Sequence, residues 1–145
     1  MEIVIFMGIQ ASGKSTFYKE NFFRTHVRIN LDMLRTRHRE NIILDACFRA
    51  KQPCVVDNTN PTIEDRKKYI TWAKQHDFRV IGYYFEPDYK GSVERNAQRI
   101  QDEQIPIIGL KSTLHKLHSP HYDEGFDKVY HVKMLDRTFS VERKS

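Results

Sequence analysis

The sequence predicts an α/β fold in three layers, with helices on both faces of a mostly parallel sheet. Short apolar runs typical of buried strands alternate with longer segments that carry apolar residues at helical spacing. The first apolar run, "EIVIFM", leads directly into a glycine-rich turn. No linker, repeat or shift in composition divides the 145 residues. We therefore expect a single domain spanning residues 1–145.

Five strands and five helices are expected, in alternation. Apolar and β-branched runs bounded by turn-forming residues predict strands within 2–7, 26–30, 52–60, 78–86 and 128–134. Apolar residues at helical spacing predict helices at 14–24, 31–50, 62–76, 92–103 and 105–118. Pro61 precedes the third helix, where a first-turn proline is favoured, and Pro87 stops the fourth strand. The helical region 90–118 would form a lid, and the polar tail 135–145 would fray or pack loosely.

Composition excludes several classes of protein. A hydrophobic fraction of 39% can support a core, and the apolar run at the N-terminus is too short for a signal peptide or a membrane span. Cys47 and Cys54 have no metal-binding or redox spacing, so reduced buried thiols and a cytoplasmic location are expected. A net charge of +5 suits a polyanionic partner such as nucleic acid, and it equally suits simple solubility.

The strongest functional motif is "GIQASGKST", which lies between a predicted strand and a predicted helix. It contains a glycine, four intervening residues, and then Gly-Lys-Ser. That context is the one required for a P-loop, whose backbone N–H groups surround the phosphates of a nucleotide. Lys14 would reach the β and γ phosphates, Ser15 would bind Mg²⁺, and Thr16 would contact the α phosphate. The predicted nucleotide-binding residues of the loop are Gly8, Ile9, Gln10, Ala11, Ser12, Gly13, Lys14, Ser15 and Thr16. ATP and Mg²⁺ are thus the expected cofactors.

Asp57 follows the third predicted strand, in "VVDNTNP". Ligands of open α/β sheets bind beyond the carboxyl ends of the strands, so Asp57 is expected close to the P-loop. There it would act on the metal side, either through a water on Mg²⁺ or by a bond to Ser15. The alternative is that Asp57, Asn58 and Asn60 only cap the next helix.

Two further pairs are spaced for a shared helical face. Asp32 and Arg35 are three residues apart after the second strand, and together they suit an acceptor with a hydroxyl and a neighbouring phosphate. Arg95 and Arg99 are four apart, as expected for a lid over the transferring phosphoryl group. Each pair has a plain alternative, an ordinary surface ion pair for the first and solvated arginines for the second.

Taken in order, "GIQASGKST", "DMLR", "DNTN" and "RNAQR" resemble the pattern of the polynucleotide 5′-hydroxyl kinase family of P-loop phosphotransferases. A later "EGFDKVY" also resembles a stretch before that family's last strand. The likeness spans nearly the whole chain, and the ordered set is more specific than any one motif. It implies a P-loop NTPase that transfers the γ-phosphate of ATP to the 5′-OH end of DNA or RNA.

The resemblance also implies roles for individual residues. Asp32 would be the general base for the 5′-OH, and Arg35 would bind the adjacent phosphate of the acceptor. Arg99 would act with Lys14 on the donor phosphates, while Arg95 would flank the adenine, with Ile105 as a second candidate for that contact.

Members of the family often carry a phosphatase or ligase domain as well. We expect the present chain to phosphorylate 5′ ends only, unless it is an excised domain or has a separate phosphatase or ligase partner. No membrane partner is expected. Two alternatives stay open. One is a kinase of a small hydroxyl compound such as a nucleoside, sugar or antibiotic, and the other is a nucleotide-binding module without transfer.

Overall fold

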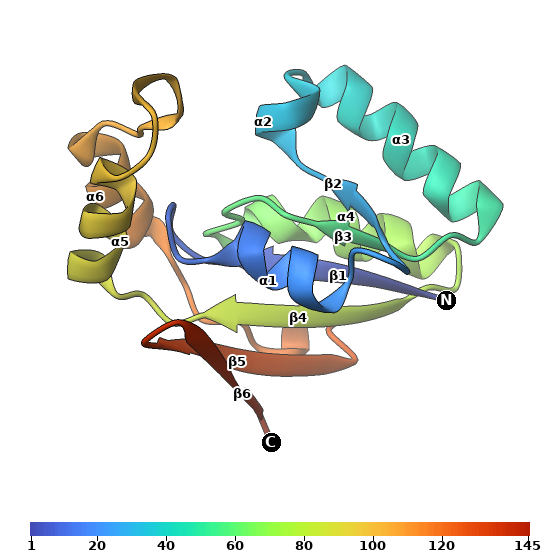
Figure 1. Cartoon of the computed structure of the whole chain (residues 1–145). Coiled ribbons are helices and arrows are strands. Elements are labelled where there is room, and N and C mark those ends of the chain that lie inside the picture. Colours follow the sequence, from blue (N-terminus) through green and yellow to red (C-terminus); the bar gives the residue numbers. More distant parts are fainter.

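The computed structural model describes residues 1–145 and confirms the α/β fold, with a six-stranded sheet at its centre (Figure 1). The strand order is β2-β3-β1-β4-β5-β6, and all neighbours are parallel except β5 and β6. The strands are β1 (Glu2–Met7), β2 (Val27–Ile29), β3 (Cys54–Val56), β4 (Arg79–Phe85), β5 (Lys128–Leu135) and β6 (Thr138–Arg143). Such an order places the ends of β1, β2 and β3 at one edge of the sheet, where the ligand of an open α/β fold binds.

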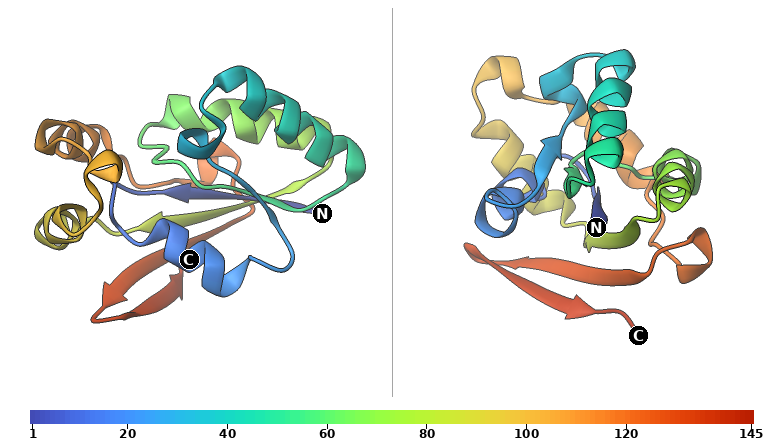
Figure 2. Two further views of the ribbon diagram at one scale, coloured as in Figure 1. Left: turned by 45° about the horizontal axis from the view of Figure 1, so that its top comes forward. Right: turned by 90° about the vertical axis from the view of Figure 1, so that its right-hand side faces the viewer.

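Helices cover both faces of the sheet, as predicted, but unequally (Figure 2). On one face lies α1 (Lys14–Asn21), whose Phe17 packs with Val4 and Phe6 of β1 in the smaller core. The other face is covered by α3 (Arg37–Ala50) and α4 (Ile63–Gln75), which bury a larger core with Ile3 and Ile5 of the same strand. Alternate side chains of β1 thus enter opposite cores, and the strand is buried along most of its length.

The predicted helix over 31–50 is divided into α2 (Leu31–Leu34) and α3. Arg35 ends α2 with a φ of 75°, which no helix can continue. Thr36 then begins α3 as its N-cap, because its side-chain oxygen accepts a hydrogen bond from the backbone N–H of Arg39. The break separates Asp32 from the residues of α3, so they do not share one helical axis.

The prediction of a loose polar tail at 135–145 is wrong. Residues 138–143 form β6, which pairs with β5 through a two-residue turn at Asp136 and Arg137, with Asp136 at a φ of 56°. Apolar Phe139 and Val141 alternate with polar residues in "TFSVER", and Phe139 packs against the smaller core while Val141 is exposed. The sheet therefore has six strands instead of the five expected.

The lid region lies beyond the carboxyl ends of β1 and β4 (Figure 1). It consists of α5 (Tyr89–Ala97), a 3₁₀ turn η1 (Gln101–Glu103) and α6 (Ile107–Lys116). Asn96 links α5 to the segment that leads into α6, because its amide both donates to the carbonyl of Ile105 at 2.7 Å and accepts from the N–H of Ile105 at 2.8 Å. A second 3₁₀ turn, η2 (Tyr122–Glu124), precedes β5. None of the helices is both long and apolar enough to cross a membrane.

Candidate active site

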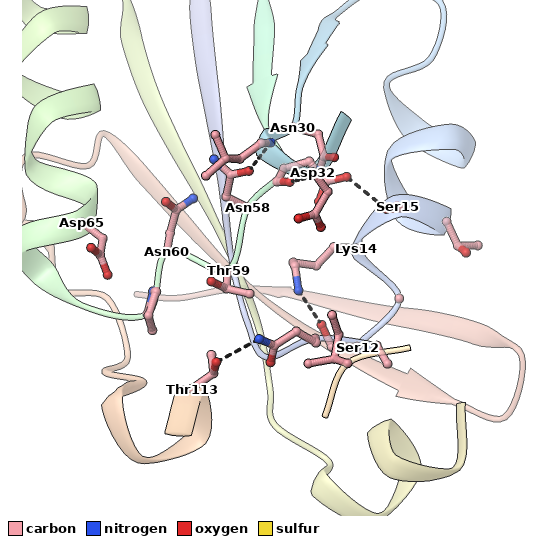
Figure 3. Close-up of a pocket in the computed structure, with 18 of the residues that line it drawn as sticks. Ser12, Lys14, Ser15, Asn30, Asp32, Asn58, Thr59, Asn60, Asp65 and Thr113 are labelled. Atoms are coloured by element: carbon pink, nitrogen blue, oxygen red, sulfur yellow. Dashed lines mark hydrogen bonds between the residues drawn. The ribbon is translucent and has the colours of Figure 1, made fainter. Parts of the chain in front are cut away.

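A polar cavity of about 490 Å³ opens at the carboxyl edge of the sheet (Figure 3). Its walls come from the P-loop, the segments that follow β2 and β3, α6, and the stretch between α5 and α6 that carries Arg99 and Ile105. Ten of the predicted site residues line it: Gln10, Ala11, Ser12, Gly13, Lys14, Ser15, Thr16, Asp32, Asp57 and Arg99. Gly8, Ile9, Arg35 and Arg95 do not, and Ile105 does.

The backbone of the P-loop is held in a shape that glycine makes accessible. Gly13 has a φ of 90°, and a Cβ at this position would lie 2.9 Å from a ring carbon of Phe139. At Gly8 a Cβ would lie 2.9 Å from the Cβ of Phe85, so this position also has no space for a side chain. The N–H of Gly8 donates to the carbonyl of Thr59 at 3.0 Å, which joins the loop to the segment after β3. The loop therefore has the restricted geometry expected of a phosphate cradle.

Lys14 begins α1 and is buried beneath the loop. Its ammonium donates to the carbonyls of Gly8 and Ile9, at 3.1 and 2.6 Å, and to the hydroxyl of Ser12 at 3.3 Å. Burial lowers the pKa of Lys14 to about 8; the nearby charge of Arg99 lowers it too, while the carboxylates of Asp57 and Asp32 oppose the shift. A partly desolvated cation at this place is well suited to bind phosphate.

Ser15 and Asp57 meet as predicted. The Ser15 hydroxyl donates to Oδ2 of Asp57 at 3.2 Å, and the Asp57 side chain is 2% exposed. Both are hard oxygen donors at the edge of a phosphate cradle, so the pair fits Mg²⁺ by its chemistry. The alternative that residues 57–60 cap the next helix is wrong, because α4 is capped by Thr62 in a reciprocal capping box with Asp65.

Arg28 of β2 joins this pair and was missed by the sequence analysis. Its Nε donates to Oδ2 of Asp57 at 2.8 Å, and Nη2 donates to the hydroxyl of Ser15 at 2.8 Å. The ion pair compensates the charge of the buried carboxylate. A charged residue in the middle of a short strand, "VRI", was the available signal.

Asp32 lies on α2, which is four residues long and has no buried residue. Two asparagines hold this turn by hydrogen bonds, and its one packing contact with the larger core comes from the partly buried Leu34. Asn30 is its N-cap, since its Oδ1 accepts from Met33 N–H at 2.9 Å while its Nδ2 donates to the carbonyl of Asp57 at 2.6 Å. Asn58 accepts from the N–H of Leu31 at 2.9 Å. Asp32 is thereby placed on the same cavity as Lys14, opposite the P-loop (Figure 3).

Arg35 is exposed and makes no hydrogen bond through its guanidinium, whereas Arg37 lines the cavity. Arg37 is paired with Glu40, which is completely buried and also accepts from Lys68 and from the Tyr69 hydroxyl, at 3.0 and 2.8 Å. Burial alone would raise the pKa of Glu40, but these donors hold it below its usual value. Asn58 donates to the same carboxylate at 3.1 Å, so Glu40 is linked to the turn that carries Asp32.

The two lid arginines lie in different places. Arg95 donates from Nε to the carbonyl of Ala11 at 2.7 Å and so joins α5 to the P-loop. Arg99 lies beyond the end of α5 and lines the cavity. A second contact between loop and lid comes from Gln10, whose Nε2 donates to the hydroxyl of Thr113 on α6 at 3.0 Å. The lid is therefore attached to the donor side of the cavity.

Comparisons with known proteins agree with this arrangement. The family model described as "AAA domain" matches residues 36–119. The chain is 29% identical over 135 residues to a bifunctional polynucleotide phosphatase/kinase of Schizosaccharomyces pombe. The aligned region covers 90% of this chain and 33% of the relative. A putative bifunctional polynucleotide phosphatase/kinase of Acanthamoeba polyphaga mimivirus is 27% identical over 135 residues, with coverage of 88% and 32%. The chain thus spans about a third of the length of these curated relatives.

Among solved structures, a gluconokinase from Sinorhizobium meliloti superposes with a TM-score of 0.62 at 18% identity, covering 91% of this chain and 82% of that chain. At this identity the likeness concerns the fold alone. The likeness agrees with the α/β fold that the sequence predicts.

Proposed function

The chain belongs to the AAA domain family, and on that premise we propose that it is an ATP- and Mg²⁺-dependent polynucleotide 5′-hydroxyl kinase. The observation that carries the proposal is that Asp32 lines the same cavity as the P-loop and Lys14. A carboxylate opposite a phosphate cradle suits transfer to a hydroxyl, and mere nucleotide binding has no need of it. The two relatives named as polynucleotide phosphatase/kinases support a nucleic-acid end as the acceptor.

On the donor side, the loop N–H groups and Lys14 would hold the β and γ phosphates of ATP. Arg99 would approach from the lid and neutralise the charge that develops on the transferring group. Ser15 and Asp57 would hold Mg²⁺, which when bound supplies further neutralisation of the phosphate oxygens. The adenine would then lie near Arg95 and Ile105, of which only Ile105 lines the cavity.

On the acceptor side, Asp32 would accept the proton of the 5′-hydroxyl as its oxygen attacks the γ-phosphorus. A new oxygen–phosphorus bond forms while the bond to the β–γ bridging oxygen breaks, and ADP leaves with that oxygen. The proton then passes from Asp32 to solvent. Catalysis would rest on positioning and charge neutralisation, as is usual for phosphoryl transfer.

Labelled ATP, Mg²⁺ and 5′-OH oligonucleotides of DNA and RNA provide the test. We expect label at the 5′ end, loss of transfer on chelation of the metal, and little transfer by Asp32→Asn. The proposal is overturned if label is transferred neither to DNA nor to RNA. Transfer to nucleosides or to gluconate in the same assay would favour the alternative of a kinase that acts on a small hydroxyl compound. ATP binding without transfer to any acceptor would indicate a nucleotide-binding module. A separate phosphatase or ligase partner stays a prediction.

A further inference from the structure

The break between α2 and α3 separates two arginines that lie two residues apart in the sequence. Arg37, the first residue of α3, lines the cavity, whereas Arg35 at the break does not. We propose that Arg37 binds a backbone phosphate of the acceptor strand, next to the nucleoside that carries the reacting 5′-OH. The proposal rests on the proposed function, since it names a contact that selects a polynucleotide over a free nucleoside.

The guanidinium of Arg37 is fixed on one edge only. Nη1 donates to both carboxylate oxygens of Glu40, at 3.0 and 3.3 Å, and to the Tyr69 hydroxyl at 3.0 Å. Nε and Nη2 make no hydrogen bond within the protein, and the Arg37 side chain is 57% exposed. A guanidinium carries five N–H donors in a rigid plane, so three donors are left for a ligand. Those donors lie in the fork geometry that matches a phosphate.

The charge around Arg37 favours an anion. Glu40 is paired with Lys68 as well as with Arg37, so one carboxylate is shared by two cations. The cluster therefore keeps a net positive charge, and Arg39 adds another exposed cation on the same helix. Because Glu40 is fully buried and the two cations are about half exposed, the positive groups are the ones that solvent or a ligand can reach. Phosphate is the anion that a nucleic acid presents at regular spacing along its backbone.

The position of Arg37 also follows from the acceptor-side scaffold. Glu40 binds Arg37 directly and reaches the turn of Asp32 through Asn58. One buried carboxylate thus fixes both the proposed base and the proposed phosphate contact. A strand bound at Arg37 would have its terminal hydroxyl placed against a base that the same hydrogen bonds hold.

Binding of a fluorescent 5′-OH oligonucleotide, measured by anisotropy from low to high KCl, tests this contact without turnover. Loss of one phosphate contact to a single strand lowers the slope of log K against log [salt] by about 0.7. We expect this decrease for Arg37→Gln, together with roughly tenfold weaker binding at low salt. Arg37→Lys should keep most of the slope, because the charge is kept. The matched control is Arg49→Gln, on the exposed far end of the same helix.

An unchanged salt slope in Arg37→Gln, or a decrease of equal size in Arg49→Gln, would overturn the proposal. Arg35→Gln is measured in parallel, and a phosphate contact at Arg35 alone would also overturn it. ATP binding and the midpoint of thermal unfolding show whether the Arg37 variants keep their fold. If the wild-type chain binds the oligonucleotide with the expected salt dependence but transfers no phosphate, the kinase proposal fails and the Arg37 contact stands. If it binds no oligonucleotide, both fail.

Discussion

The donor side and the acceptor side of the cavity differ in how they are anchored. The P-loop lies between β1 and α1, whose side chains fill two cores, and its lysine is buried. On the acceptor side, the turn that carries Asp32 has no fully buried residue; Asn30 and Asn58 hold it by hydrogen bonds, and only Leu34 packs partly against the core. Apolar packing is non-directional, whereas each hydrogen bond has one donor and one acceptor. We infer that single substitutions can disturb the acceptor side while the donor side stays intact.

Asp32→Asn should give the largest effect that separates the two sides. The amide cannot accept the hydroxyl proton as a base, so we expect kcat to fall by about 100- to 10,000-fold. ATP affinity should change little, because Asp32 makes no hydrogen bond to the loop and its charge is the weakest of those that act on the pKa of Lys14. Single-turnover kinetics and ATP titration measure the two quantities. A parallel loss of ATP affinity would show that the two sides are not separable.

Glu40→Gln tests the scaffold of the acceptor side. The substitution replaces charge-assisted bonds from Arg37 and Lys68, so we expect the free energy of unfolding to fall by about 2 kcal/mol. The acceptor KM should rise while the ATP KM stays within twofold. Denaturant unfolding and steady-state kinetics check these expectations. Asp45→Asn is the control, since its pair with Arg49 on the same helix is exposed and should contribute little.

The pH dependence of nucleotide binding tests the donor side alone. Burial lowers the pKa of Lys14 to about 8, so the ammonium is lost as the pH rises through this value. Bound phosphates favour the charged form, so ATP affinity should be level below pH 8 and fall by up to about tenfold per pH unit above it. Calorimetric titration across this range measures it, and Lys14→Met should bind weakly with no such inflection.

The same titration affects stability in the opposite direction. Without nucleotide, the unfolded chain holds the Lys14 proton more tightly than the native chain. The free energy of unfolding should therefore rise from pH 8 towards the ordinary lysine pKa of 10.5. A flat profile of the difference between wild type and Lys14→Met would contradict this assignment.

Asn58→Ala should give the smallest effect, and it tests whether the acceptor side can be disturbed without the donor side. It removes the acceptor for the N–H of Leu31 and one donor to Glu40, at a cost of about 1 kcal/mol. If the lost hydrogen bonds displace Asp32, the activation free energy rises by a similar amount. In that case kcat falls about fivefold and ATP binding is unchanged. Equal effects on both substrates would instead indicate a general loosening of the cavity.

Features whose backbone geometry is set by neighbouring residues can be predicted from the sequence. Glycine spacing between a strand and a helix predicted the P-loop, and Asp57 was placed by the rule for strand ends. The helix break at Arg35 could not be predicted, because the apolar periodicity continues across it and the sequence gives no signal for a positive φ at an arginine. The sequence does not single out Glu40, and it leaves Arg37 within "RTRHR" open between a backbone contact and a solvated side chain. The reason is that the partners Lys68, Tyr69 and Asn58 come from other elements. The alternation in "TFSVER" was visible but was outweighed by its polarity.

The packing of Gly13 against β6 has a consequence for the order in which the molecule folds. A Cβ on Gly13 would meet the ring of Phe139, so the P-loop rests on side chains from the opposite end of the chain. Contacts between residues far apart in sequence form late, because a long loop must close before they can stabilise anything. The phosphate cradle should therefore reach its final shape among the last parts of the fold. Exchange of the Phe17 N–H, which donates to the carbonyl of Gly13 at 2.9 Å, should be slowed during refolding only after β5 and β6 have paired.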